Sequence, residues 1–318
     1  MILSGYRFDT ENLRKELKEM GVRKALLQVP DGLRYKSKEL VNEFDVDTEI
    51  WGGSCYGACD LPASIDDADV LIHVGHSEIP NLKPNYPVIY VEAWNTAKYD
   101  VPDDFVEMFT GKKIAVYSTV QYMEQRDKMA DILEENDAEV TMGRGDERIK
   151  HPGQVLGCNF SSRCEADEHI FIGTGSFHPV GLSLSLNKSV HVFDPVMERY
   201  YTTEKMLDRL LRKRFASITL AEEKESFAII VSDKIGQERY GLAADLKDEC
   251  DLCAVVHMNE ISPDKIDSLG FDVAVNTACP RLALDDSIRF KTIMLTPCEF
   301  RIARKELEWD EWKMDEID

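Results

Sequence analysis

VLIHVGHSEIP at residues 70–80, HIFIGTGSFHP at residues 169–179 and FDVAVNTACPR at residues 271–281 share one pattern. Each is a short apolar run that ends in a loop of small and polar residues. The three stretches lie about a hundred residues apart, which is the mark of an internal repeat. This repeat predicts three copies of one structural unit.

Matching strands flank each of these stretches. An earlier strand is KALLQVPDGL at 24–33, KIAVYSTVQY at 113–122 and SFAIIVSDKI at 226–235. A later strand is YPVIYVEAW at 86–94, KSVHVFDPVM at 188–197 and FKTIMLTPCEF at 290–300. Short Val, Ile and Leu runs that alternate with amphipathic stretches predict parallel strands covered by helices.

The predicted architecture is α/β, with three homologous domains at residues 1–105, 106–221 and 222–318, each a small parallel sheet flanked by helices. The charged linker at 222–225 supports the second boundary. Ligands of such sheets bind beyond the carboxyl ends of the strands. Packing about a pseudo-threefold centre would direct these loops to one site, whereas three domains in a row would not.

Composition and charge narrow the class of protein. The chain has 318 residues, of which 43% are hydrophobic and 31% charged, as in ordinary globular proteins. Its net charge of −21 argues against direct nucleic-acid binding, which uses Lys and Arg. No long apolar run is present and the N-terminal stretch is charged early, so we expect no membrane segment and a cytoplasmic location. The basic run at residues 209–214 is interpreted as the end of a helix.

Three cysteines occupy related positions in the repeats. Cys59 and Cys158 each lie before the small-residue loop of their repeat, and Cys279 lies directly after the second strand of the third. A reducing compartment disfavours disulfides, so such cysteines suggest a metal site. Three thiolates leave one iron of a [4Fe-4S] cluster open, whereas structural zinc normally takes a fourth ligand. We therefore predict one cluster bound by Cys59, Cys158 and Cys279.

The other five cysteines have no assigned role. Cys55, Cys164 and Cys298 are interpreted as packing residues, although Cys298 follows a third strand. Cys250 and Cys253 have the spacing of a redox pair or half a zinc site, but without a second such pair we favour structural thiols.

Polar residues in the strand-end loops are candidates to bind a polar cosubstrate, because such loops meet at one edge of a sheet. Five of them follow first strands, and His76 and His178 occupy matching later loops. Gly175 belongs to a short glycine loop without the third glycine of a dinucleotide site. The candidates are Gln28, Asp31, Gly32, His76, Gln121, Gly175, His178 and Asp233. The acidic tail with Trp309 and Trp312 is predicted to be an amphipathic docking helix without a catalytic role.

Four motifs together carry a resemblance to a known family: QVPDGL at 28–33, YGACD at 56–60, LGC at 156–158 and NTACPR at 276–281. At these positions the chain resembles the archaeal enzymes that catalyse the first step of diphthamide biosynthesis. The likeness extends over nearly the whole sequence.

That resemblance implies a homodimeric transferase of the noncanonical radical S-adenosylmethionine (SAM) type. Its [4Fe-4S] cluster would bind SAM and, on reduction by an electron donor, cleave the bond from sulfur to the γ-carbon. The 3-amino-3-carboxypropyl radical would then add to the imidazole C2 of one histidine in translation elongation factor 2. The resemblance therefore implies that the cluster ligands are Cys59, Cys158 and Cys279.

Three other functions stay open on the residues alone. One is a quinolinate synthase-like enzyme, whose cluster acts as a Lewis acid. Another is a noncatalytic, cluster-bearing partner subunit. The third is a zinc or thiol-redox protein built around Cys250 and Cys253.

Overall fold

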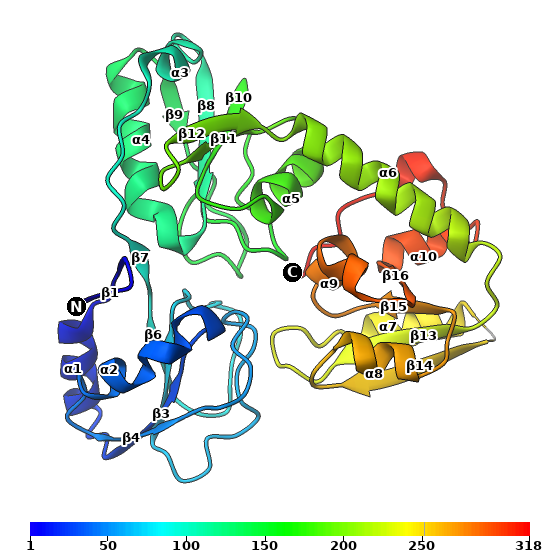
Figure 1. The fold of residues 1–318 in the computed structure, drawn as a ribbon, viewed down its shortest axis with the longest axis horizontal. Helices are drawn as coiled ribbons and strands as arrows, with labels where there is room; N and C mark the ends of the chain where they lie inside the picture. The colour runs from blue at the N-terminus through cyan, green and yellow to red at the C-terminus, as the bar shows by residue number, and fades with distance from the viewer. Residues whose placement is uncertain (251) are drawn as a thin grey trace. The chain divides into compact units, whose positions relative to one another are not determined.

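Three parallel sheets of the same strand order make up the framework of the protein in the computed structural model, which describes residues 1–250 and 252–318 (Figure 1). The first sheet has the order β4-β3-β5-β6 and the third has the order β14-β13-β15-β16. The second sheet has the order β12-β11-β10-β8-β9, which repeats the pattern and adds β12 at one edge. In each sheet the first strand along the chain lies between the second and the third.

The strand bounds follow the predicted apolar runs closely. The first sheet comprises β3 (Lys24–Gln28), β4 (Asp47–Ile50), β5 (Val70–Val74) and β6 (Val88–Val91). The second comprises β8 (Lys113–Ser118), β9 (Glu139–Thr141), β10 (Glu168–Ile172), β11 (His191–Asp194) and β12 (Arg199–Thr202). The third comprises β13 (Phe227–Ser232), β14 (Cys253–Met258), β15 (Val273–Asn276) and β16 (Ile293–Leu295). A small antiparallel sheet joins β1 (Ile2–Leu3), β2 (Tyr6–Arg7) and β7 (Trp94–Asn95).

Helices or 3₁₀ turns follow the first strand of each parallel sheet, whereas β4, β5 and β6, as well as β9 and β10, are joined by fully described loops without a helix. The helices are α1 (Thr10–Glu19), α2 (Ser37–Val41), α3 (Asp103–Glu107), α4 (Met123–Glu135), α5 (Phe177–Leu186), α6 (Glu204–Ala221), α7 (Tyr240–Asp248), α8 (Pro263–Ser268), α9 (Arg281–Leu284) and α10 (Pro297–Ala303). Short 3₁₀ turns lie at Asp31–Lys36, Val120–Tyr122, Asp286–Arg289 and Trp309–Glu311. The α/β class predicted from the sequence is confirmed.

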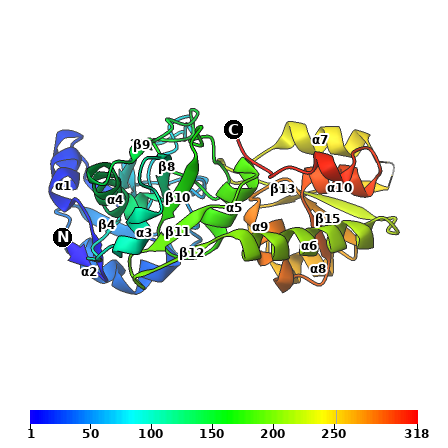
Figure 2. The same ribbon diagram turned by 90° about the horizontal axis from the view of Figure 1, so that it is seen from above.

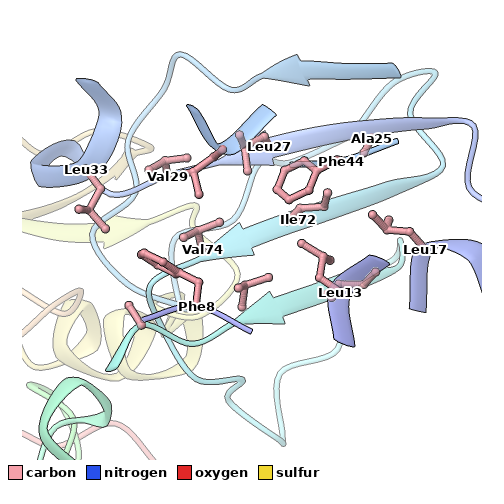
Figure 3. Packing of buried hydrophobic residues seen from close by; sticks show 14 of the residues in the cluster. Phe8, Leu13, Leu17, Ala25, Leu27, Val29, Leu33, Phe44, Ile72 and Val74 are labelled. Carbon is pink, nitrogen blue, oxygen red and sulfur yellow. The ribbon is translucent and has the colours of Figure 1, made fainter. Parts of the chain in front are cut away.

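The first sheet buries one face against α1 and the segment that contains α2. Alternate residues of β3, Ala25 and Leu27, lie in this core together with Leu13 and Leu17 of α1 (Figure 3). This period of two is what a strand must show when one of its faces packs on a helix. Strand β5 is buried at every position, which explains why four of its five residues are apolar, His73 being the exception.

The third sheet is covered on both faces. Phe227, Ile229 and Val231 of β13 share a core with α6, α7 and α10. Ala228 and Ile230, on the opposite face, pack with residues of α8 and α9. Figure 2 shows α7 and α10 on one side of β13 and β15, with α8 and α9 on the other.

The chain divides into two compact units. One consists of Met1–Val155, Ser161–Thr174 and His191–Tyr201, and contains the first two sheets; the other consists of Leu156–Phe160, Gly175–Val190 and Thr202–Asp318. The domain boundaries at 105/106 and 221/222, and the pseudo-threefold arrangement, stay predictions. Within residues 1–250 and 252–318, no helix combines the length and the apolar character needed to cross a membrane.

Two predictions about the helices are wrong. The basic run at 209–214 does not end a helix, because α6 continues to Ala221. Within that run Arg214 is fully buried, and its Nε donates to Oε1 of Glu299 at 2.7 Å. The tail contains only the short turn Trp309–Glu311 in place of an amphipathic helix. Trp309 and Trp312 do pack against the hydrophobic core that the third sheet forms with α6, α7 and α10.

Candidate functional site

The three predicted cluster cysteines follow the carboxyl ends of strands. Cys59 lies between β4 and β5, and Cys158 lies between β9 and β10, so each follows the second strand of its sheet. Cys279 comes three residues after the end of β15. None of the three takes part in the disulfide that the described residues contain. This edge of a parallel sheet is where ligands of such folds bind.

The loop around Cys59 is closed by its own hydrogen bonds. The buried carboxylate of Asp60 accepts from the hydroxyl of Ser54 at 3.2 Å and from the backbone N–H of Tyr56 at 3.0 Å. The Gln28 amide nitrogen donates to the carbonyl oxygens of Ser54 and Asp60, at 2.9 and 2.7 Å. Both ends of the loop are therefore tied to the end of β3, which fixes the backbone that carries Cys59.

Cys158 sits in a tight turn between Leu156 and Asn159. The backbone N–H of Leu156 donates to the Asn159 carbonyl oxygen at 2.9 Å. A Cβ on Gly157 would approach a ring carbon of Phe177 to 2.7 Å, so this position accepts glycine only. The turn thus packs directly against the start of α5.

Cys279 lies in a turn shaped by the last residue of β15 and the residue after it. The Asn276 amide donates to the Cys279 carbonyl oxygen at 2.9 Å, and its own oxygen accepts from the N–H of Ala278. The Thr277 hydroxyl donates to the Ile230 carbonyl oxygen at 2.8 Å. The polar residues of the NTACPR motif are therefore used to shape the backbone on either side of the thiol.

A tail segment, residues 314–317, contacts both of these cysteine loops. The Ile317 N–H donates to the carbonyl oxygen of Cys158 at 2.7 Å. The guanidinium of Arg239 donates to both carboxylate oxygens of Asp315, at 2.9 and 2.7 Å, and to the Thr277 carbonyl oxygen at 2.6 Å. The tail segment and Arg239 were not among the residues predicted from the sequence. They join backbone near Cys158 to backbone near Cys279.

His178 lies in the first turn of α5, beside the same two loops. A Cβ on Gly157 would lie 3.7 Å from its Nε2. Burial, reinforced by the positive charge of Arg281, lowers the pKa of His178 to about 4. The imidazole is therefore neutral at physiological pH. Gly175, also predicted, lies in the loop before α5 with a φ of 78°.

Three of the other predicted residues come together in the first unit. Gln28 connects through His73 to His76, and the Gln121 amide donates to the Gly75 carbonyl oxygen at 2.8 Å. Gln28 is completely buried, so its observed role is to support the Cys59 loop. His73 was not predicted, because its place inside an apolar strand gives no sign that its ring is hydrogen-bonded.

The remaining candidates have local partners. Asp31 is largely exposed and pairs with Arg34, one turn further along the same 3₁₀ helix. Gly32 belongs to that helix as well. Asp233 accepts from the hydroxyl of Tyr240 at 3.2 Å. A role for these three residues in binding SAM stays a prediction.

The other cysteines differ in their surroundings. Cys55 and Cys298 are buried, and Cys164 is partly exposed near the hydroxyl of Tyr117. Cys250 and Cys253 form a disulfide, so the interpretation of the pair as separate structural thiols is wrong. Both lie in the hydrophobic core that the third sheet forms with α6, α7 and α10, and Cys253 is the first residue of β14.

The donor set fits an iron-sulfur cluster. Cys59, Cys158 and Cys279 offer soft sulfur ligands, which suit iron-sulfur clusters. Each belongs to a loop that hydrogen bonds have already shaped. Gly57, next to Cys59 in its loop, lies so close that an added Cβ would be 3.4 Å from the Cys59 sulfur. Small neighbours of this kind leave space for a bulky inorganic group.

Fold and site together define an α/β protein of repeated parallel sheets with cysteines in its strand-end loops. Its sequence matches the family described as "Putative diphthamide synthesis protein" over residues 29–313. It is also 36% identical to the Pyrococcus horikoshii protein named 2-(3-amino-3-carboxypropyl)histidine synthase, over 93% of this chain and 91% of that protein. The chain therefore belongs to the diphthamide synthesis family, which confirms the resemblance seen in its motifs.

Other known proteins agree with this assignment. A Methanocaldococcus jannaschii protein of the same name is 26% identical, over 98% of this chain and 95% of that protein. The Caenorhabditis elegans protein named 2-(3-amino-3-carboxypropyl)histidine synthase subunit 1 is 27% identical, over 98% of this chain and 84% of that one. The crystal structure of Dph2 from Pyrococcus horikoshii with a 4Fe-4S cluster is similar with a TM-score of 0.87 and 34% identity, covering 98% of this chain and 94% of that chain.

Proposed function

We propose that this protein transfers the 3-amino-3-carboxypropyl group of SAM to the imidazole C2 of a histidine in translation elongation factor 2. This is the first step of diphthamide biosynthesis and makes the protein a transferase. The observation that carries the proposal is that three cysteines outside the disulfide lie in shaped strand-end loops of a chain that belongs to the diphthamide synthesis family.

Cys59, Cys158 and Cys279 are the proposed ligands of one [4Fe-4S] cluster. When bound, the cluster supplies one electron for cleavage of the bond from sulfur to the γ-carbon of SAM, next to an iron that has no cysteine ligand. The shaped loops hold the three thiols in place before the metal arrives. The neutral imidazole of His178 offers a polar contact beside the Cys158 turn for the cosubstrate, and Gly175 in the loop before α5 is a further candidate.

Three further features belong to the same proposal. The protein works in the cytoplasm as a homodimer, which is the commonest assembly of soluble oligomers. It receives electrons from a separate donor. It does not bind nucleic acid directly, because its net charge of −21 opposes contact with a phosphate backbone.

An anaerobic experiment tests the function. The purified protein is reconstituted with iron and sulfide, reduced with dithionite, and mixed with SAM and elongation factor 2. We expect methylthioadenosine together with a factor whose mass has increased by one aminocarboxypropyl group on histidine. Replacement of Cys59, Cys158 or Cys279 by alanine removes the cluster's absorbance and paramagnetic resonance signal, whereas the control Cys164→Ser keeps both.

Other outcomes point to the other functions. Intact SAM with a bound cluster contradicts the transfer reaction and favours either a Lewis-acid enzyme or a noncatalytic subunit. A colourless protein that contains zinc contradicts the cluster itself. Sedimentation measurements on the same preparation test the dimer, and a monomer would overturn that part of the proposal alone.

A further inference from the structure

Two buried side chains and one partly buried side chain form a hydrogen-bond relay behind the Cys59 loop, here defined as Gln28, His73 and His76. Gln28 ends β3, His73 lies in β5, and His76 lies in the loop after β5. Nδ1 of His73 is 2.7 Å from Oε1 of Gln28, and Nε2 of His73 is 2.9 Å from Nδ1 of His76. All three residues belong to the first compact unit.

The direction of these hydrogen bonds is fixed at the Gln28 end. Its amide nitrogen donates to two backbone carbonyl oxygens, those of Ser54 and Asp60, so the amide cannot be turned round. Oε1 of Gln28 is therefore an acceptor, and Nδ1 of His73 must carry the proton. Nε2 of His73 is then unprotonated, and its lone pair accepts a hydrogen bond from Nδ1–H of His76.

The relay consequently leaves the lone pair on Nε2 of His76 without a role in the chain of hydrogen bonds. A neutral imidazole that carries its proton on Nδ1 has an unprotonated Nε2. Within residues 1–250 and 252–318, Nε2 of His76 has no hydrogen-bond partner. Gln28 and His73 are completely buried, whereas His76 is only partly so. The open end of the relay is thus its most accessible member.

His76 lies close to the Cys59 loop. The two carbonyl oxygens that anchor the relay belong to residues 54 and 60, on either side of Cys59. Asp60 is near enough for its charge to act on the pKa of His76, although burial is the larger effect and lowers that pKa to about 4. The ring is therefore neutral, with its lone pair available, at physiological pH.

The reaction proposed above requires a proton acceptor. Joining the aminocarboxypropyl carbon to C2 of an imidazole replaces the C2–H bond by a C–C bond. The hydrogen leaves as a proton, and one electron leaves with it. That electron equals the one consumed in cleaving the carbon–sulfur bond of SAM, so the overall change needs no net oxidant or reductant. The proton must be taken up by a base.

We propose that Nε2 of His76 accepts the C2 proton of the substrate histidine, and that Gln28 and His73 act as positioning residues that fix the tautomer of His76. This inference rests on the proposed function. General bases contribute about 10²–10⁴-fold to a reaction that needs them.

Neighbouring groups are poorer acceptors. Burial raises the pKa of Cys55 to about 12, so its thiol is protonated at neutral pH. Both ring nitrogens of His73 are already occupied in the relay. Both carboxylate oxygens of Asp60 accept hydrogen bonds within the Cys59 loop.

The same cluster has a second chemical interpretation that the experiment must separate. Sγ of Cys55 and one nitrogen each of His73 and His76 lie within 4.8 Å of one another, a spacing that a metal ion could bridge. The relay, however, satisfies Nε2 of His73 and Nδ1 of His76 without a metal.

The test compares three variants with the parent protein by measuring two products separately. His76→Ala is expected to keep forming methylthioadenosine while modified elongation factor falls by about 10²-fold or more. His76→Gln, which can accept a hydrogen bond but not retain a proton, should behave in the same way. Added imidazole should partly restore the modification in His76→Ala. The control His191→Ala removes an imidazole from β11, where it pairs with Glu168, and should match the parent.

A second measurement does not depend on activity. Nitrogen-15 spectra of the full-length, histidine-labelled protein before cluster loading should show His76 protonated at Nδ1 and bare at Nε2. His73→Phe should convert this signal to a mixture of tautomers. Full modification by His76→Gln, a parent His76 protonated at Nε2, or stoichiometric zinc that His76→Ala loses would each overturn the inference. Failure of the parent to cleave SAM refutes the proposed function instead, whatever the tautomer.

Discussion

Glu92 is an acidic residue that the fold has almost removed from water. Its side chain is only 8% exposed and follows β6. Burial alone would raise its pKa, but hydrogen bonds from His151 at 2.8 Å and ionic contact with Lys150 at 3.0 Å outweigh burial and lower the pKa to about 2. Because an unfolded glutamate titrates near pH 4.3, the ionised form is favoured by folding.

The pH dependence of stability follows from this shift. The contribution of Glu92 is complete above about pH 4.3 and is lost as the pH falls toward 2. We expect Glu92→Gln to lower the free energy of unfolding at pH 7 by about 1–3 kcal/mol, because His151 and Lys150 then face a neutral amide in place of a negatively charged acceptor. Urea unfolding at several pH values should show the two proteins converging in acid.

An exposed glutamate provides the matched control. Glu39 pairs with Lys36 at 2.6 Å on the surface of α2, where solvent screens the charges. Its replacement by glutamine should change stability by about 0–1 kcal/mol at most. A constant difference between Glu92→Gln and the parent from pH 7 down to pH 2 would contradict the assigned pKa.

Individual residues differ in how far the sequence predicts their roles. Cys59, Cys158 and Cys279 were predicted as cluster ligands from the repeat, and the structure places each of them after the carboxyl end of a strand, while their role as ligands stays a prediction. Arg214 was misinterpreted because nothing nearby in sequence reveals its partner, Glu299, which is 85 residues away. His73 was missed for the same reason, since its hydrogen-bond partner Gln28 is 45 residues distant.

Among the elements, the tail segment is the one whose role departs most from expectation. The acidic tail was predicted to dock through Trp309 and Trp312, which precede this segment, and to have no catalytic role. The backbone of the tail segment instead bonds to the Cys158 turn, and Asp315 is paired with Arg239, which also bonds to the turn before Cys279. A short irregular segment has no periodicity, so no pattern in the sequence could have indicated this position.

Removal of the Arg239 guanidinium should release the tail segment. In Arg239→Met the carboxylate of Asp315, only 10% exposed, loses its partner and is expected to move into solvent. The amide of Ile317 should then exchange with deuterium faster, and affinity for iron should fall by about 10–100-fold, as when outer contacts of metal ligands are lost. Exchange mass spectrometry and iron titration measure the two effects.

Arg212→Met is the matched control for that experiment. Arg212 is exposed and pairs with Asp208 one turn away on α6, so its loss leaves the tail segment and the iron affinity unchanged. If Ile317 exchanged at the parent rate in Arg239→Met, the tail segment would not depend on this ion pair.

At the scale of the whole molecule, the fold was more predictable than the site. Every strand of the three parallel sheets is short, and most are almost wholly apolar, so alternation with helices was visible without a structure. The strand order within each sheet was not predicted, because right-handed connections between parallel strands allow several orders. Some of the hydrogen bonds that shape the cysteine loops, such as those from Gln28 to Ser54 and Asp60, join residues far apart in the sequence, and those contacts exist only after the sheets have formed.

Net charge is the remaining property of the whole chain with a measurable consequence. A charge of −21 means that the folded protein repels itself, and compaction brings those charges together. Raising the ionic strength from about 0.01 to 0.15 M shortens the screening length from about 30 to 8 Å. We therefore expect the thermal unfolding midpoint to rise over this range. Sodium and potassium chloride should act equally, because screening depends on ionic strength, and a midpoint that falls with both salts would show that attractive ion pairs such as Arg239 with Asp315 outweigh the repulsion.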